Sequence, residues 1–187
     1  MGNRRVGRKR LYELEKAGQS VELDSGIGIK KAIISASQHR QGQEIVTEIA
    51  IDLAKSGAVI NDGGGARAVV GKNGDASEIT KLTVAKFGII TEIRAVVVED
   101  IASATMDDLD LEYHASTRNA GVTLSTASIL TGLTDKGVDN STEYDNNVLS
   151  DKFLFLVDGK GGGNTSNEFT AGKILIYIYG FEAPADL

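Results

Sequence analysis

The sequence predicts a mainly β protein, a β-sandwich of jelly-roll type with an extended basic N-terminal arm. Two observations predict the sandwich. Apolar and polar residues alternate over several short segments, and the chain has 22 Gly but only one Pro in its 187 residues, a composition that suits tight turns between strands. A third observation predicts the arm: the first ten residues hold five cations and no acid.

The arm differs in charge from the rest of the chain. Residues 1–16 carry six Lys or Arg against two Glu, whereas residues 17–187 carry 14 Lys or Arg against 24 Asp or Glu. We expect the arm to dock on a negative surface, with a protein favoured over nucleic acid because the acidic body repels phosphates. The expected contact residues are five cations and three apolar anchors: Arg4, Arg5, Arg8, Lys9, Arg10, Leu11, Tyr12 and Leu14.

We divide the chain into an arm with its lead-in segment, residues 1–43, and a sandwich body, residues 44–187. The arm is at most locally helical, since Leu11 and Leu14 are spaced i, i+3. Residues 18–43 are mixed in pattern and could belong to either part.

The body begins with an alternating segment at 44–53, which places Ile45, Ile49, Ile51 and Leu53 on one face, and Glu48 and Asp52 on the other. Residues 153–157 are continuously apolar, which predicts a central strand. Residues 122–131 could form a strand or a helix, while 135–147 and 159–167 are polar and predicted to be loops. The other predicted strands are 66–70, 79–84, 88–99, 109–113 and 173–179.

Acidic residues alternate with aliphatic ones around the 109–113 strand. Asp108, Asp110 and Glu112 would all lie on one side of it. We expect that side to be an exposed face of a sheet.

Glycine clusters in the chain lack the context of a nucleotide-binding loop. Gly26 and Gly28 have no third glycine, and Gly172-Lys173 is followed by Ile174, where a phosphate loop needs Ser or Thr. We interpret these glycines, with 161–163, as hairpin glycines.

The sequence gives little evidence for a catalytic or cofactor-binding site. The two histidines, His39 and His114, are distant in sequence, and no nucleophile elbow is present. We therefore expect no enzyme activity, no cofactor and no specific metal site. Two acidic groups are the candidates for calcium, without the spacing of a known calcium loop: Asp107, Asp108 and Asp110, and Asp135, Asp139, Glu143 and Asp145.

The composition also argues against disulfides, thiolate metal sites and membrane helices. The chain has no Cys, so disulfides and thiolate metal sites are excluded. No run approaches the ~20 apolar residues of a membrane helix, so we expect no membrane contact.

The opening residues 1–12, MGNRRVGRKRLY, resemble the start of small virion structural proteins of marine tailed bacteriophages. The similarity extends to 88–93, to 108–111 and to 170–176. It implies a capsid decoration or cement protein in the virion, made in the cytoplasm of the host bacterium. It also implies a partner, the major capsid protein, and self-association, commonly as a homotrimer.

Three other functions remain open at this stage. One is a jelly-roll coat protein whose basic arm contacts nucleic acid. Another is a tail or head-fibre adhesin that binds a ligand through loops such as 135–147 or 159–167. The third is a calcium-dependent structural module, which a melting shift with added calcium would test.

Overall fold

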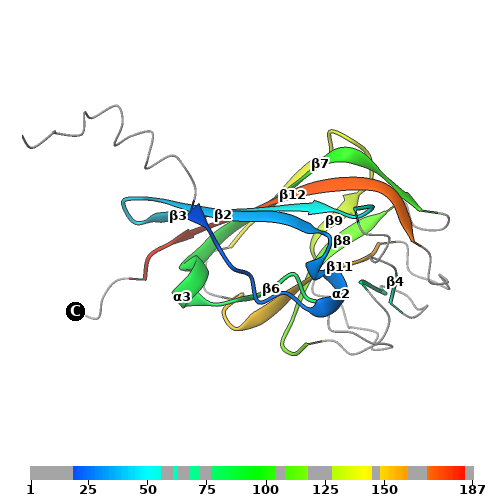
Figure 1. Ribbon diagram of the computed structural model, residues 1–187. Helices are drawn as coiled ribbons and strands as arrows, with labels where there is room; N and C mark the ends of the chain where they lie inside the picture. Colours follow the sequence, from blue (N-terminus) through cyan, green and yellow to red (C-terminus); the bar gives the residue numbers. More distant parts are fainter. Residues whose placement is uncertain are drawn as a thin grey trace, which may run out of the picture.

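The computed structural model describes residues 19–55, 61–62, 68–71, 77–103, 108–117, 128–144, 148–159 and 168–183. These residues form two antiparallel sheets that face each other (Figure 1). The prediction of a mainly β protein is confirmed. The arm residues, from Arg4 to Leu14, lie outside the described part of the chain.

The first sheet contains the longest strands. Its strand order is β1 (Gln19–Ser20), β2 (Ile33–Gln41), β3 (Glu44–Asp52), β12 (Phe169–Phe181), β7 (Ile89–Ser103) and β10 (Asp139–Glu143). The lead-in segment thus supplies two strands of this sheet, β1 and β2.

The second sheet is built around β11. Its order is β4 (Asn61–Asp62), β5 (Val69–Val70), β11 (Lys152–Asp158), β8 (Leu109–His114) and β9 (Ser128–Leu133), and β6 (Thr80–Leu82) also pairs with β11. The prediction that 153–157 forms a central strand is confirmed, since β11 pairs with β5, β6 and β8.

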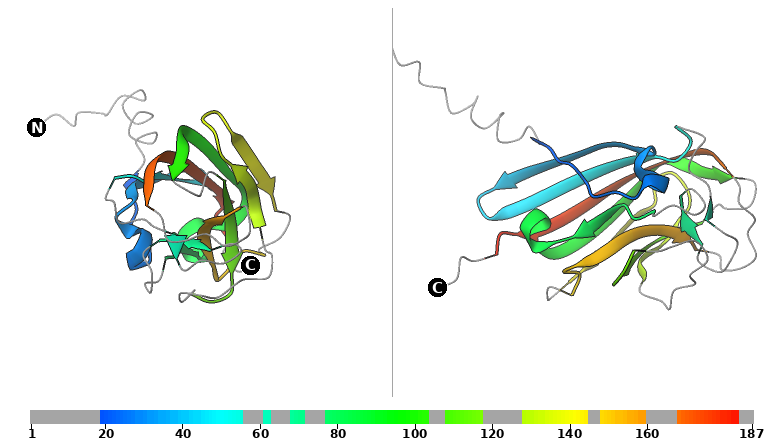
Figure 2. Two further views of the ribbon diagram at one scale, coloured as in Figure 1. Left: turned by 90° about the vertical axis from the view of Figure 1, so that its right-hand side faces the viewer. Right: turned by 60° about the horizontal axis from the view of Figure 1, so that its bottom comes forward.

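The core between the sheets is aliphatic, and it follows from the alternation in the sequence. Ile45, Ile49 and Ile51 of β3 are buried on the inner face, as predicted, and Ile174 and Ile176 of β12 join them. The end-on view in Figure 2 shows the strands arranged around this core. Burial of such side chains, about 1.5–3 kcal/mol each, is the main force that holds the sheets together.

Side-chain hydrogen bonds join the two sheets along one edge. Asn140 Nδ2 of β10 donates to the carbonyl oxygen of Thr131 in β9, at 2.8 Å, and Thr142 Oγ1 donates to that of Ile129, also at 2.8 Å. The prediction of a loop over 135–147 is therefore wrong for Asp139–Glu143. This strand is polar because one of its faces meets solvent and the other bonds to the neighbouring sheet.

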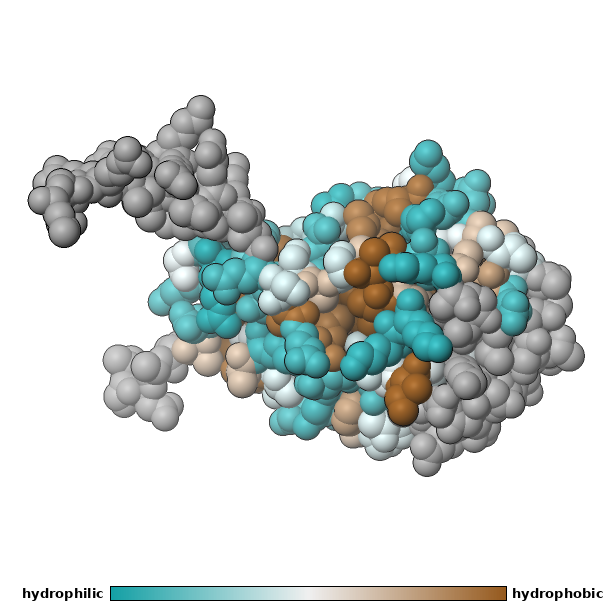
Figure 3. Space-filling model, viewed as in Figure 1, coloured by the Kyte–Doolittle hydropathy of each residue, from teal (hydrophilic) through white to brown (hydrophobic). Residues whose placement is uncertain are grey.

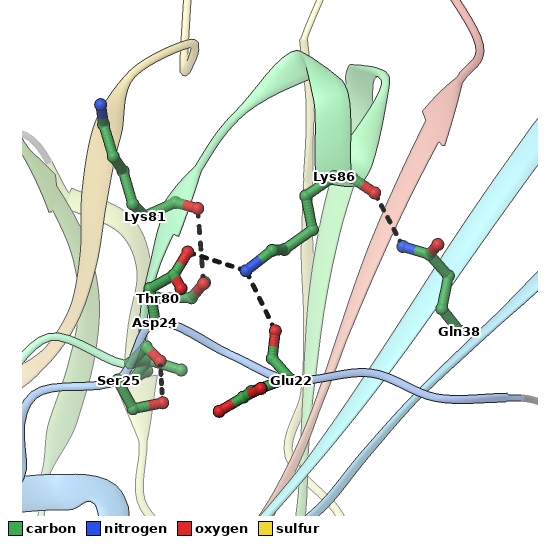
Figure 4. A network of polar contacts seen from close by, with 8 residues as sticks. Glu22, Asp24, Ser25, Gln38, Thr80, Lys81 and Lys86 are labelled. Carbon is green, nitrogen blue, oxygen red and sulfur yellow. Dashed lines mark hydrogen bonds and ion pairs between the residues drawn. The ribbon is translucent and has the colours of Figure 1, made fainter.

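The lead-in segment joins the sheets along the opposite edge. Lys86 Nζ, in the short helix α3 (Val84–Phe87), donates to Asp24 Oδ2 at 2.8 Å and to the carbonyl oxygen of Glu22 at 3.0 Å (Figure 4). Gln38 Nε2 of β2 donates to the carbonyl oxygen of Lys86, and Ser25 Oγ donates to that of Ile79. These contacts fix the start of the described chain to both sheets.

Three of the predicted hairpin glycines serve other purposes. Gly26 and Gly28 lie at the start of and inside the short helix α2 (Ile27–Lys30). Gly172 lies inside β12 at an irregularity of pairing, with φ +131°. A positive φ at a bulge is readily adopted only by glycine, so this residue shapes the strand and makes no turn.

Candidate interaction surface

The outer face of the first sheet carries a row of apolar side chains. Register places Leu175 of β12 between Ala50 of β3 and Val96 of β7. All three are half-buried on the side away from the core. We call this side the open face, because no described helix or strand lies over it (Figure 2). Figure 3 shows hydrophobic surface over β7 and β12, bordered by hydrophilic residues.

Ion pairs fix two basic side chains of the open face. Arg94 Nε donates to Asp139 Oδ1 at 2.6 Å, and a second guanidinium nitrogen contacts Oδ2. Lys173 Nζ lies 2.5 Å from Glu99 Oε2. The hydrogen bond from Arg94 holds the pKa of Asp139 below its usual value of 3.8, and the bond to Glu99 raises the pKa of Lys173.

Two tyrosines stand side by side on the open face. The rings of Tyr177 and Tyr179 stack with centroids 6.3 Å apart and planes 26° apart. Partial burial, reinforced by the carboxylate of Glu48, raises the pKa of Tyr177. Stacked tyrosines offer a rigid surface that is apolar in its body and polar at its tip, a property enriched in protein interfaces.

A groove of about 350 Å³ opens where β12 ends, and we call it the end groove. Tyr179, Val46 and Phe181 give it aromatic and aliphatic surface, and Phe181 has 41% of its own surface exposed. The groove is lined by Glu44, Ile45, Val46, Thr91, Glu92, Tyr179, Gly180 and Phe181.

Three carboxylates at this end of the sheet lack a cationic partner. Glu44 and Glu92 line the groove, and Glu143 of β10 stands directly opposite Glu92 in the pairing of β10 with β7. Within the described residues, none of the three forms an ion pair. The end groove is therefore acidic as well as aromatic.

Glycines allow α3 to close against the end groove from the inner side. A Cβ on Gly180 would lie 2.1 Å from the carbonyl oxygen of Phe87, and one on Gly88 would lie 2.2 Å from that of Phe181. Gly88 also has φ +69°. Only glycine fits this close backbone approach, which fixes the end of β12 beneath the groove.

The outer face of the second sheet is covered, in contrast to the open face. Phe155 and Val157 of β11 are fully buried there and form a small second cluster with Val69. Asp110 and Glu112 of β8 pair with these two β11 residues and are also buried, at 3% and 0% exposure. The prediction that the acids of this strand mark an exposed face is therefore wrong. The continuous apolar run of β11 gives the reason, because it needs cover on both faces.

Asp110, one of the buried carboxylates of β8, has a hydrogen-bond partner in β9. Asp110 Oδ1 accepts a hydrogen bond from the backbone N–H of Gly132 at 3.0 Å. Gly159 lies against both Asp108 and Asp110, since an added Cβ would be 2.9 Å from an oxygen of each. Among the described residues, no group of three or more His, Asp or Glu is placed to hold a metal ion.

The remaining candidate residues are dispersed. Asp107 and Asp145 lie outside the described residues, and Asp139 is engaged by Arg94. His39 lies in β2. His114 ends β8, where its Nδ1 lies 3.2 Å from the backbone nitrogen of Ser116.

No sequence pattern singled out the end groove, because its residues come from the ends of β3, β7 and β12. Their side-by-side placement follows from strand register, which one sequence does not reveal. Glu92 and Arg94 belong to the predicted strand 88–99, and the structure puts both on the open face.

Comparison with known proteins gives no relative. No protein-family model, no curated protein and no solved structure matches the chain. In the described part of the chain, no helix is long and apolar enough to cross a membrane.

Proposed function

We propose that this chain is a non-enzymatic virion structural protein that decorates a phage capsid. The observation that carries the proposal is the contrast between the two sheets. One outer face is covered and buries Phe155 and Val157, whereas the other is open and carries an apolar row flanked by fixed ion pairs. A broad face of this kind suits contact with a flat protein surface.

The body is of jelly-roll type in this proposal. A jelly roll distributes successive strands over two four-stranded sheets and brings its first and last strands together in one of them. The strand orders β3-β12-β7-β10 and β5-β11-β8-β9 agree with that arrangement. Here β1 and β2 extend the first sheet beyond the eight strands.

The partners in the proposal are the major capsid protein and further copies of this chain, as a homotrimer. The resemblance of residues 1–12 to small virion proteins supports the capsid, and the basic arm with its apolar anchors supports attachment to an acidic protein surface. Individual exposed ion pairs contribute only about 0–1 kcal/mol. Binding strength therefore comes from repetition across linked copies.

Co-sedimentation of the full-length protein with purified, undecorated capsids tests the proposal. Leu175→Glu places a charge in the middle of the open face and should weaken capsid binding at least ten-fold, equivalent to about 1.4 kcal/mol. Ile27→Glu is the matched control, because Ile27 is 71% exposed in α2, away from the open face. Equal capsid binding by both variants, with unchanged circular dichroism, would contradict the proposal.

A further inference from the structure

We propose that the end groove binds the basic N-terminal segment, residues 4–14, of a second copy of this chain. The inference rests on the proposed structural function and names the contact through which copies would join. Its first support is uncompensated charge. Glu92 and Glu143 face each other across β7 and β10 on the open face, and like charges in that position destabilise a sheet. A cation seated between them would remove the repulsion.

Neighbouring cations of the first sheet are already engaged. Arg94 is bound to Asp139, and Arg40 Nη1 lies 3.3 Å from Glu182 Oε1. Lys173 is bound to Glu99, beyond the groove along β12. The positive charge that matches the groove must therefore come from elsewhere.

The walls of the end groove match the apolar part of the same segment. Tyr179, Val46 and Phe181 offer an aromatic and aliphatic surface between the carboxylates. Residues 4–14 combine five cations with Leu11, Tyr12 and Leu14. An acidic, aromatic groove and a basic segment with apolar anchors are complementary both in charge and in polarity.

The described part of the chain starts near the end of the sheet that carries the groove. Gln19, the first described residue, pairs with Gln38, three residues before the end of β2. Glu44, which begins the next strand, pairs with Phe181 in the lining of the groove. Figure 1 shows that the described chain starts and finishes at this end of the sandwich.

The length of the segment allows it to reach the groove of a neighbouring copy. Gln19 in β1 is three strands away from β12, a distance of about 14 Å across the sheet. Eighteen residues precede Gln19 and can span up to about 60 Å when extended. Each copy then offers one segment and one groove, and a head-to-tail contact of this kind closes into a ring when the rotation permits.

Charge reversal in the full-length chain tests the inference, with sedimentation velocity as the measurement. Glu44→Lys with Glu92→Lys should weaken self-association at least ten-fold, and so should Arg8→Glu with Arg10→Glu. All four changes together should restore most of the association, because the opposite charges then face each other again. The matched control is Glu168→Lys, an exposed acid next to the other end of β12, which should change association less than two-fold.

A zero-length carbodiimide cross-link identifies the contact directly. Lys9 supplies the amine, and Glu44 and Glu92 supply carboxylates. In an equal mixture of ¹⁴N- and ¹⁵N-labelled full-length protein, we expect cross-links from Lys9 to these residues that join light with heavy chains. Cross-links confined to chains of one label, or no rescue by the four-fold variant, would overturn the inference.

The two proposals fail in distinguishable ways. A protein that stays monomeric at every concentration, yet binds capsids through the open face, overturns the inference and leaves the capsid function standing. A protein that self-associates through the groove but does not bind capsids contradicts the capsid function alone.

Discussion

The contrast between the two outer faces makes a quantitative prediction about two phenylalanines. Phe155 of β11 has no exposed surface, whereas Phe181 of β12 has 41% of its surface exposed. Removal of a fully buried phenylalanine costs about 3–5 kcal/mol, because lost burial and a remaining cavity add together. Phe181→Ala loses only part of the 1.5–3 kcal/mol that complete burial provides, so we expect about 1 kcal/mol.

Urea unfolding of the full-length variants, followed by far-ultraviolet circular dichroism, measures both values. In a chain of this size 1 kcal/mol corresponds to about 2–4 °C in Tm, so Phe155→Ala should lower Tm by about 6–20 °C. Phe181→Ala should instead weaken self-association, since Phe181 lines the end groove. A loss of less than about 1 kcal/mol for Phe155→Ala would refute the argument that the second sheet is covered on its outer face.

Three further predictions follow from single contacts. Gly180→Ala should lower the free energy of unfolding by several kcal/mol, because its Cβ would lie 2.1 Å from a backbone carbonyl oxygen. Gly42→Ala has open space around the new Cβ but a φ of +63°, so it should lower that free energy by only about 1–2 kcal/mol. Thermal unfolding of both variants measures the difference. Glu143→Gln should raise the free energy of unfolding by about 0.2–1 kcal/mol, since it removes the repulsion with Glu92, and a loss of stability would contradict that reasoning. Burial raises the pKa of Tyr144 from 10.0 to about 12, so stability should fall as the pH rises from 10 to 12, and the fall should be smaller in Tyr144→Phe.

The β class and the main strands could be predicted because their alternation reflects the core directly. Ile45, Ile49 and Ile51 alternate with Glu48 and Asp52 in the sequence, and all three isoleucines are buried in β3. The continuous apolar run of β11 likewise marked a strand in the middle of a sheet. In these segments the local pattern and the tertiary environment agree.

The prediction failed where a strand faces something other than core and solvent. β10 is polar throughout, because its inward side chains, Asn140 and Thr142, bond to backbone carbonyls of β9. Asp110 and Glu112 alternate with leucines as exposed residues would, but the second sheet is covered on that side. In both cases a neighbour from a distant part of the sequence decides the environment.

The end groove could not be predicted from the sequence, which singled out only the basic segment that we propose binds there. The cations of residues 4–10 stand out in an acidic chain, whereas the end groove depends on which strand ends lie side by side. Glu44 and Glu92 are 48 positions apart in the sequence and meet only because β12 pairs with both β3 and β7. Register of this kind is a property of the folded sheets.

The most direct test of the central claim is quantitative mass spectrometry of purified virions, giving the copy number of this chain relative to the major capsid protein. The account predicts a copy number comparable to that of the capsid subunit. A handful of copies per virion would place the chain in a tail or fibre, and its complete absence from virions would contradict the proposed function.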